Sequence, residues 1–306
     1  MTDRRRFLHS TGLAAGALFT SPLLAAAGAA PQAGGGASAT IASAADFATL
    51  EAASRGRLGV AVMDAGGRYH GGHRPDERFP MCSTFKAVLA AAVLAQADRG
   101  ALDLDQRLPV RAADMVPHAP LTARHVGKDL TIRDLCRATM VTSDNPAANL
   151  LLARLGGPPA LTAFLRAQGD AVTRSDRLEP EMNRFAADDP RDTTSPRAMA
   201  ASLGRLVAGN ALSPASRRQL ADWLVDNQTG DTCLRAGIGP QWRVGDKTGS
   251  NGADTRNDIA VLWPLDGGPP WVVSAYLQGA KVDSAARDAV LARAGRLALA
   301  VIGQAA

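Results

Sequence analysis

Lysine is scarce in this chain of 306 residues. Only four of the 34 basic residues are lysines, and two of these, Lys86 and Lys247, stand in the segments Ser-Thr-Phe-Lys and Lys-Thr-Gly. Arginine keeps its charge under nearly all conditions, whereas a lysine gives up its proton readily when it is buried or lies near another cation. Only lysine can therefore serve as a base. Lysines that were accidents of composition should stand in featureless sequence, and these two do not.

Aromatic residues are also few, at 4% of the chain, and no basic run with interleaved aromatic residues occurs. The chain therefore has few side chains on which nucleic-acid bases could stack. The net charge is +5, and removal of an N-terminal segment that carries Arg4, Arg5 and Arg6 against Asp3 takes away +2 and leaves +3. This charge is too small to indicate a nucleic-acid partner.

Cysteine and histidine are sparse as well. The three cysteines, an odd number, cannot all pair within one chain, so no disulfide framework is implied. The five histidines do not show the spacing of zinc ligands with acidic or cysteine partners. We therefore expect no metal and no cofactor.

Residues 1–30 form a predicted export signal. Three arginines precede an apolar stretch from Leu13 to Leu24, and small residues follow it. A transmembrane anchor is the alternative, but the stretch is short, contains Pro22 and ends in an Ala-x-Ala cleavage pattern. We expect a twin-arginine-type signal peptide, a flexible leader over 31–42, a periplasmic protein and no stable membrane association after cleavage.

The remaining chain predicts an α/β fold. Amphipathic or apolar patterns indicate a helix over 43–55, strands over 58–64 and 68–73, a long helical block, strands over 242–248, 259–263 and 271–277, and a last helix over 284–302. Strands on either side of a helical block indicate one five-stranded antiparallel sheet flanked by the terminal helices, with an inserted all-helical domain. We expect an α/β domain from 43–81 plus 228–306 and a helical domain from 82–227.

Ser83 and Lys86 form the only Ser-x-x-Lys in the chain. Ser83 is predicted to open a helix, with Lys86 one turn later on the same face and its amine within reach of the hydroxyl. A serine is a weak nucleophile that needs such a base. Alternatively, Ser83 is a plain helix cap and Lys86 is solvated.

Two further polar segments accompany this pair. Ser143-Asp144-Asn145 lies between two predicted helices, and Lys247-Thr248-Gly249 ends a predicted strand, where glycine permits close approach of a substrate backbone. Taken singly, the first is an ordinary capping loop and the second an ordinary turn.

Together, the three segments resemble the ordered motif set of class A β-lactamases and penicillin-binding proteins. The similarity runs from about Ser43 to the C-terminus. A fourth segment, over about 174–192, resembles the Ω-loop of that family and carries Glu179, Asn183, Arg177 and Asp192. A β-lactamase must direct water onto its acyl-enzyme, which requires a carboxylate base and a second group to fix the water. Glu179 and Asn183 match these two roles.

The resemblance implies hydrolysis of the β-lactam amide of penicillins and cephalosporins through a serine acyl-enzyme, by a monomer that confers antibiotic resistance. Ser83 would attack while the backbone N–H groups of Ser83 and Ser250 hold the oxyanion. Ser143 would protonate the leaving nitrogen, and either Lys86 or Glu179 would be the acylation base. Arg177 and Asp192 would pair to close the Ω-loop. The implied substrate-binding residues are Asn145, Asn183, Lys247, Thr248, Gly249, Ser250 and Arg256, the last of which is equally well explained as a surface strand residue.

Several positions depart from the family pattern or vary within it. Cys136 faces Ala90 where some relatives form a disulfide, and Cys82 would face Asn251 where carbapenem-hydrolysing relatives have the partner cysteine. By the resemblance, His118 stands where many relatives carry an aromatic residue and would form one wall of the site mouth; alternatively it is an exposed loop histidine. Two rival functions remain: a D-alanyl-D-alanine peptidase, which would deacylate slowly, and a β-lactam sensor, which would stay acylated and lack the Glu179 and Asn183 pair.

Overall fold

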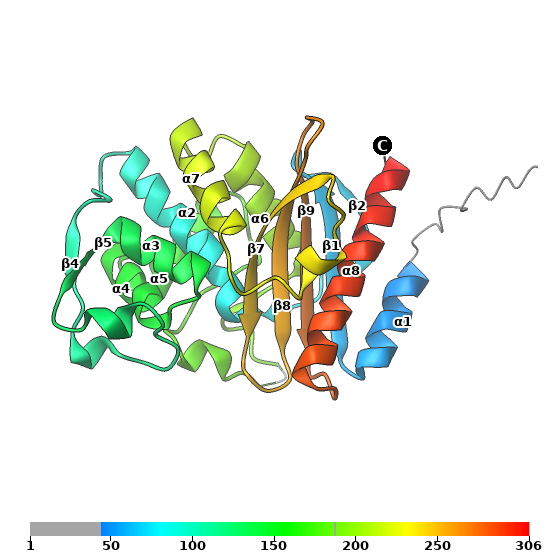
Figure 1. Cartoon of the computed structure of the whole chain (residues 1–306), viewed down its shortest axis with the longest axis horizontal. Helices are drawn as coiled ribbons and strands as arrows, with labels where there is room; N and C mark the ends of the chain where they lie inside the picture. The colour runs from blue at the N-terminus through cyan, green and yellow to red at the C-terminus, as the bar shows by residue number, and fades with distance from the viewer. Residues whose placement is uncertain (1–43, 187, 306) are drawn as a thin grey trace, which may run out of the picture. The chain divides into compact units, whose positions relative to one another are not determined.

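The computed structural model describes residues 44–186 and 188–305, so the predicted signal peptide and leader lie outside the described part. Its central element is a five-stranded antiparallel sheet with the strand order β2-β1-β9-β8-β7 (Figure 1). The strands are β1 (Arg57–Asp64), β2 (Tyr69–His73), β7 (Trp242–Ser250), β8 (Arg256–Pro264) and β9 (Trp271–Gln278). The expected fold class is confirmed.

Strand β1 shows why the sheet is buried on both faces. Val60 and Val62 belong to one apolar cluster, whereas Ala61 and Met63 belong to another on the opposite side. Successive side chains of a strand point to opposite faces, so an unbroken apolar run fits a sheet that is covered twice.

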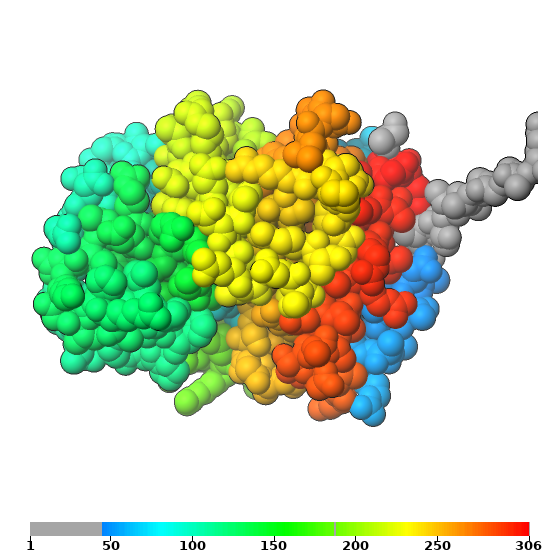
Figure 2. Space-filling model, in the orientation of Figure 1, coloured from blue at the N-terminus to red at the C-terminus, as the bar shows by residue number. Residues whose placement is uncertain are grey.

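One face of the sheet is covered by the terminal helices, α1 (Ala44–Ser54) and α8 (Ser284–Ala305), which also pack on each other. The 3₁₀ helix η5 (Leu234–Gly237) contacts α8, β7 and β8. In Figure 2 the yellow residues that include η5 cover part of these strands.

The other face packs against the helical block. Helix α2 (Phe85–Asp98) is its centre, and every residue from Phe85 to Ala95 is buried. A helix that is apolar on all sides requires neighbours on all sides. These are α3 (Ile132–Val141), α4 (Asn145–Leu155), α5 (Pro158–Ala167), α6 (Pro196–Ala208) and α7 (Pro214–Val225).

Side-chain caps fix several helix starts. Thr131, Asp144, Ser195 and Ser213 each accept a hydrogen bond from the backbone near the start of the next helix. Short elements complete the described chain: β3 (Phe79–Pro80) pairs with β6 (Thr193–Thr194), β4 (Arg107–Pro109) pairs with β5 (Asp129–Thr131), and the remaining 3₁₀ helices are η1 (Cys82–Thr84), η2 (Ala112–Asp114), η3 (Thr122–His125) and η4 (Glu181–Asn183). None of the described helices is long and apolar enough to cross a membrane.

Candidate active site

Ser83 lies in the 3₁₀ helix η1, immediately before α2, and makes no helix-capping hydrogen bond from its side chain at this junction. The alternative of a plain capping serine is therefore wrong. Its hydroxyl donates to Glu179 Oε1 at 3.3 Å. The preceding residue, Cys82, has a backbone φ of 45°, a left-handed conformation that is unfavourable for a side chain with a Cβ.

Lys86 lies on α2 and is completely buried. Its Nζ donates to Ser143 O at 2.7 Å, Asn145 Oδ1 at 2.5 Å and Ser143 Oγ at 3.2 Å, and lies 3.4 Å from Glu179 Oε1. The alternative of a solvated Lys86 is therefore wrong. Burial lowers the pKa of Lys86, and the negative charge of Glu179 opposes that shift. These hydrogen bonds go to the Ser143-Asp144-Asn145 segment, and the reach of the amine to the Ser83 hydroxyl stays a prediction.

The Ser143-Asp144-Asn145 segment combines capping with site geometry. Asp144 caps α4 and also accepts from Leu121 N and Thr122 N, at 3.0 and 2.9 Å. This anchoring holds Ser143 at a φ of 60°. Asn145 is already engaged at both ends, because its Nδ2 donates to Pro117 O at 2.8 Å. The capping interpretation is thus correct for Asp144 alone.

Lys247 reaches the same hydroxyl from strand β7. Its Nζ is 3.2 Å from Ser143 Oγ, so the two buried lysines share this one oxygen. Burial, and then the charge of Lys86, lower the pKa of Lys247 to about 7. In the unliganded site Lys247 therefore gives up its proton more readily than an ordinary lysine.

Gly249 brings strand β7 against Ser83. A Cβ atom at this position would lie 2.7 Å from Met81 O and 3.1 Å from Ser83 N. Glycine therefore permits a close approach to the chain's own backbone here, and the approach of a substrate backbone stays a prediction. Asn257 on β8 reinforces the junction by donating to Pro80 O and Met81 O.

Glu179 is 2% exposed and is held from two sides. Its Oε2 accepts from Asn183 Nδ2 at 2.6 Å. Asn149 on α4 clamps its backbone, accepting from Glu179 N and donating to Glu179 O, both at 2.9 Å. Sequence reasoning missed Asn149, because an asparagine within a helix gives no local signal of a contact 30 residues away. Asn183 Oδ1 is buried and has no partner within the described residues.

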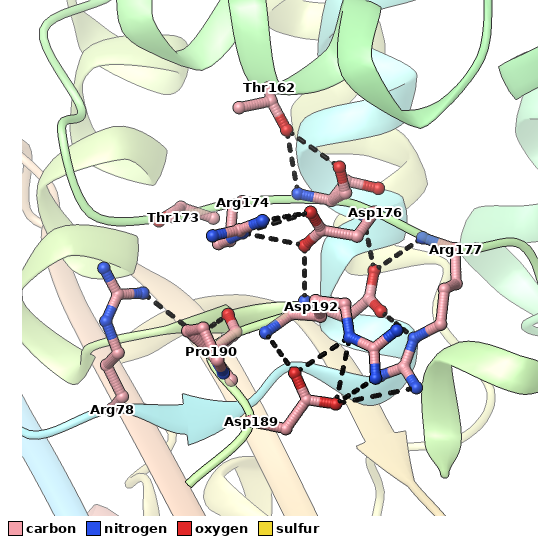
Figure 3. Close-up of polar contacts among 12 residues, drawn as sticks. Arg78, Thr162, Thr173, Arg174, Asp176, Arg177, Asp189, Pro190 and Asp192 are labelled. Atoms are coloured by element: carbon pink, nitrogen blue, oxygen red, sulfur yellow. Dashed lines mark hydrogen bonds and ion pairs between the residues drawn. The ribbon is translucent and has the colours of Figure 1, made fainter. Parts of the chain in front are cut away.

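The base of the Ω-loop is closed by charge pairs (Figure 3). Arg177 Nε donates to Asp192 Oδ2 at 2.6 Å, and Asp192 Oδ1 accepts from the backbone N–H groups of Asp176 and Arg177. The side chain of Asp176 in turn accepts a hydrogen bond from Asp192 N at 2.9 Å. Arg174 donates to the Asp176 carboxylate through two nitrogens, Nε and Nη2. These contacts join the two ends of the segment that carries Glu179.

Ser250 ends β7 and Arg256 begins β8, and the two residues pair with each other in register. Arg256 is half-buried, and its Nε donates to Asp288 Oδ1 of α8 at 2.6 Å. Arg256 is thus a partly exposed strand residue that is held by an ion pair, and both interpretations of it stay open. Ser250 Oγ donates to Thr255 O and accepts from Gly252 N.

All three cysteines are buried free thiols. Burial, and then Glu179, raise the pKa of Cys82. His118 is exposed, with a φ of 66°, and its Nε2 lies 2.9 Å from Thr142 O. Among the described residues, no group of three or more metal-ligating side chains could hold a metal ion. A cavity of about 630 Å³, lined in part by Arg57, Phe185 and Gln278, contains none of the predicted site residues.

A five-stranded antiparallel sheet, with Ser83 beside the buried Lys86, Ser143 and Glu179 at its junction with a helical block, defines a serine acyl-transfer enzyme. The chain belongs to the Beta-lactamase enzyme family, whose sequence profile matches residues 42–302, and it is a class A β-lactamase, a hydrolase of β-lactams.

The chain is 60% identical to Beta-lactamase L2 from Stenotrophomonas maltophilia over 303 residues, which cover 99% of this chain and 100% of that protein. It is 44% identical to the carbapenem-hydrolyzing beta-lactamase KPC from Klebsiella oxytoca over 258 residues, 84% of this chain and 88% of the relative. Among solved structures, L2 complexed with relebactam superposes with a TM-score of 0.81 at 66% identity, covering 84% of this chain and 95% of that chain. A beta lactamase from Xanthomonas campestris gives 0.83 at 55% identity, covering 86% and 100%.

Proposed function

We propose that Ser83 is the nucleophile and that its ester with the opened β-lactam is hydrolysed by water held between Glu179 and Asn183. The observation that carries this proposal is the position of Glu179, whose two carboxylate oxygens contact Ser83 and Asn183 separately. A water molecule between these groups would lie beside the acyl carbonyl. The buried Oδ1 of Asn183, which has no partner among the described residues, supplies a further acceptor for that water.

During acylation the serine proton leaves toward Glu179 or Lys86, the two groups that neighbour each other at 3.4 Å. The backbone N–H groups of Ser83 and Ser250 stabilise the oxyanion, and Gly249 brings their two segments together. Ser143 passes a proton to the departing ring nitrogen. Its Oγ lies between Lys86 and Lys247, so either ammonium group can replace that proton.

A second group of residues recognises the substrate. Lys247, Thr248, Ser250 and Arg256 bind the substrate carboxylate, and Asn145 and Asn183 bind the amide side chain of penicillins and cephalosporins. Arg177 and Asp192 hold Glu179 in place through the Ω-loop. The chain acts as a monomer in the periplasm after export by the twin-arginine route, without stable membrane association.

Turnover of a chromogenic cephalosporin by the purified mature protein, with mass spectrometry of Ser83, tests this proposal. Many turnovers per molecule and no persistent adduct are expected. One turnover followed by a stable adduct on Ser83 would support a sensor or a peptidase instead.

A further inference from the structure

Thr229 contacts two of the four residues that are proposed to bind the substrate carboxylate, Thr248 and Arg256. It lies in the connection between α7 and η5, and its Oγ1 makes a short hydrogen bond with Thr248 Oγ1. Its backbone oxygen accepts from Arg256 Nη2 at 3.2 Å. No motif in the sequence marked this threonine, because its partners lie 19 and 27 residues further along the chain.

The loop that carries Thr229 has anchors that do not involve its hydroxyl. Asn227 Nδ2 donates to the buried Asp246 Oδ1 at 2.8 Å, and Asn227 Oδ1 accepts from Thr229 N at 3.1 Å. Gly230 lets the loop lie directly on Asp246, since a Cβ atom there would be 1.8 Å from Asp246 Oδ2. Loss of the Thr229 hydroxyl should therefore leave the backbone where it is.

The hydroxyl hydrogens allow two arrangements. Thr229 Oγ1 has one hydrogen and two acceptors, Asn227 Oδ1 at 2.8 Å and Thr248 Oγ1. When Thr229 donates to Asn227, the short contact between the hydroxyls requires that Thr248 donate to Thr229. When Thr229 donates to Thr248, the Thr248 hydrogen is released, and Asn227 Oδ1 still accepts from Thr229 N.

We propose that Thr229 is a positioning residue that directs the hydroxyl hydrogen of Thr248 toward the substrate carboxylate. This inference rests on the proposed role of Thr248 as a carboxylate ligand. An anionic acceptor favours the second arrangement, because a hydrogen bond to a charged group is stronger than one to a neutral amide. The resulting chain from Thr229 through Thr248 to the carboxylate is polarised along its length, which strengthens its last hydrogen bond. Thr229 thus contributes selectivity for substrates that carry a free carboxylate.

The test compares Thr229→Val, which keeps the shape, with Thr229→Ser, which keeps the hydroxyl. Each is assayed on a chromogenic cephalosporin and on its methyl ester. For the free acid, Thr229→Val should raise KM about fivefold to tenfold, the effect of about one lost hydrogen bond, with kcat within about twofold of wild type. Thr229→Ser should restore KM. The ester should be turned over equally by all three proteins, which also shows that the variants are folded.

The same substitution in a Thr248→Val background separates the inference from the role on which it rests. Thr248→Val should raise KM for the free acid, and adding Thr229→Val should then have no further effect. If Thr248→Val raises KM but Thr229→Val alone does not, the positioning role is wrong while the role of Thr248 stands. If Thr248→Val leaves KM unchanged, both the role of Thr248 and the positioning role of Thr229 are wrong. Equal losses of Thr229→Val on acid and ester would indicate a structural role and would also overturn the inference.

Discussion

At the scale of single residues, the main feature of the site is a pair of neighbouring lysines, Lys86 and Lys247, whose positive charges repel each other. Both are fully buried, and both reach the one hydroxyl of Ser143. Neighbouring ammonium groups destabilise each other, and burial adds to this effect. Lys86 has Glu179 nearby as a counter-charge, whereas the largest charge effect on Lys247 comes from Lys86 itself. Asp246 and Asp258 partly oppose this effect on Lys247, and the proposed substrate carboxylate would add a further counter-charge.

The pH dependence of substrate affinity follows from the Lys247 pKa of about 7. Below that pH, Lys247 is protonated before substrate arrives, and KM should be independent of pH. Above it, binding of a carboxylate requires uptake of a proton, so KM should rise with pH, by at most about tenfold per pH unit. We expect this rise between about pH 7 and 9 for a free-acid cephalosporin and not for its methyl ester. Parallel pH profiles for acid and ester would contradict the assignment.

The role of Lys86 as a proton acceptor is tested by Lys86→Arg. The guanidinium keeps the charge but does not release its proton, so acylation of Ser83 should slow by about a hundredfold or more. Stopped-flow measurement of the acylation burst provides the rate. Lys128→Arg, at an exposed lysine, is the matched control and should leave the rate unchanged. Normal acylation by Lys86→Arg would exclude Lys86 as the base.

At the scale of elements, the Ω-loop is a segment whose geometry is set at its two ends. Asp192 is completely buried and accepts three hydrogen bonds from Asp176 and Arg177, which gather the loop ends beneath Glu179. A buried carboxylate with this many donors stabilises the folded loop chiefly because removing it leaves the donors unsatisfied.

Asp192→Asn should therefore loosen the loop. Because the amide can accept at only one of its two ends, we expect a loss of about 2–3 kcal/mol in the free energy of unfolding and slower deacylation. Denaturant unfolding and single-turnover kinetics measure the two effects. Arg197→Gln breaks the exposed pair with Asp76 and should cost less than about 1 kcal/mol. Equal stability losses for the two variants would argue against a special role for the loop closure.

Elements differ in how well the sequence predicted them, and the reasons are local. Helices α3 and α6 have clear start signals in the sequence, because Thr131 or Ser195 caps each start and Pro196 marks the first turn of α6. Strand β8 was predicted to begin at Ile259 but begins at Arg256, because polar residues pair with β7 across the site. The two-residue strands β3 and β6 were missed, since so short a segment has no periodicity.

The same limit applies to the site. Its motif residues were predictable because each belongs to a short ordered segment. Asn149 and Thr229 were not, because what makes them important is a contact formed by folding: one clamps the backbone of Glu179, and the other contacts Thr248. The hydrogen-bond partners of Lys86 were not predictable either, since one turn of helix places an amine near Ser83 but does not say which oxygens surround it.

At the scale of the whole molecule, the sheet and the helical block supply different parts of the site. Strand β7 provides Lys247 and Thr248, and the helical block provides Lys86, Ser143 and Glu179. We propose that these two parts correspond to the domain division predicted from the sequence, 43–81 plus 228–306 against 82–227.

Export is also a property of the whole chain. If residues 1–30 are a twin-arginine-type signal, replacing Arg4, Arg5 and Arg6 together with lysine should keep the charge but abolish transfer to the periplasm. Fractionation of cells that produce wild type or the variant, with activity measured in each fraction, tests this. Periplasmic activity that persists in the variant would indicate another route.

The role of Glu179 as the base that activates the deacylating water is the central claim, and one mass measurement tests it. Glu179→Ala should react with a cephalosporin and remain acylated at Ser83, so the intact mass should increase by that of the bound drug and stay increased for many wild-type turnover times. Glu181→Ala, at an exposed glutamate two residues away, should return to its original mass as wild type does. Prompt loss of the adduct from Glu179→Ala would contradict the claim.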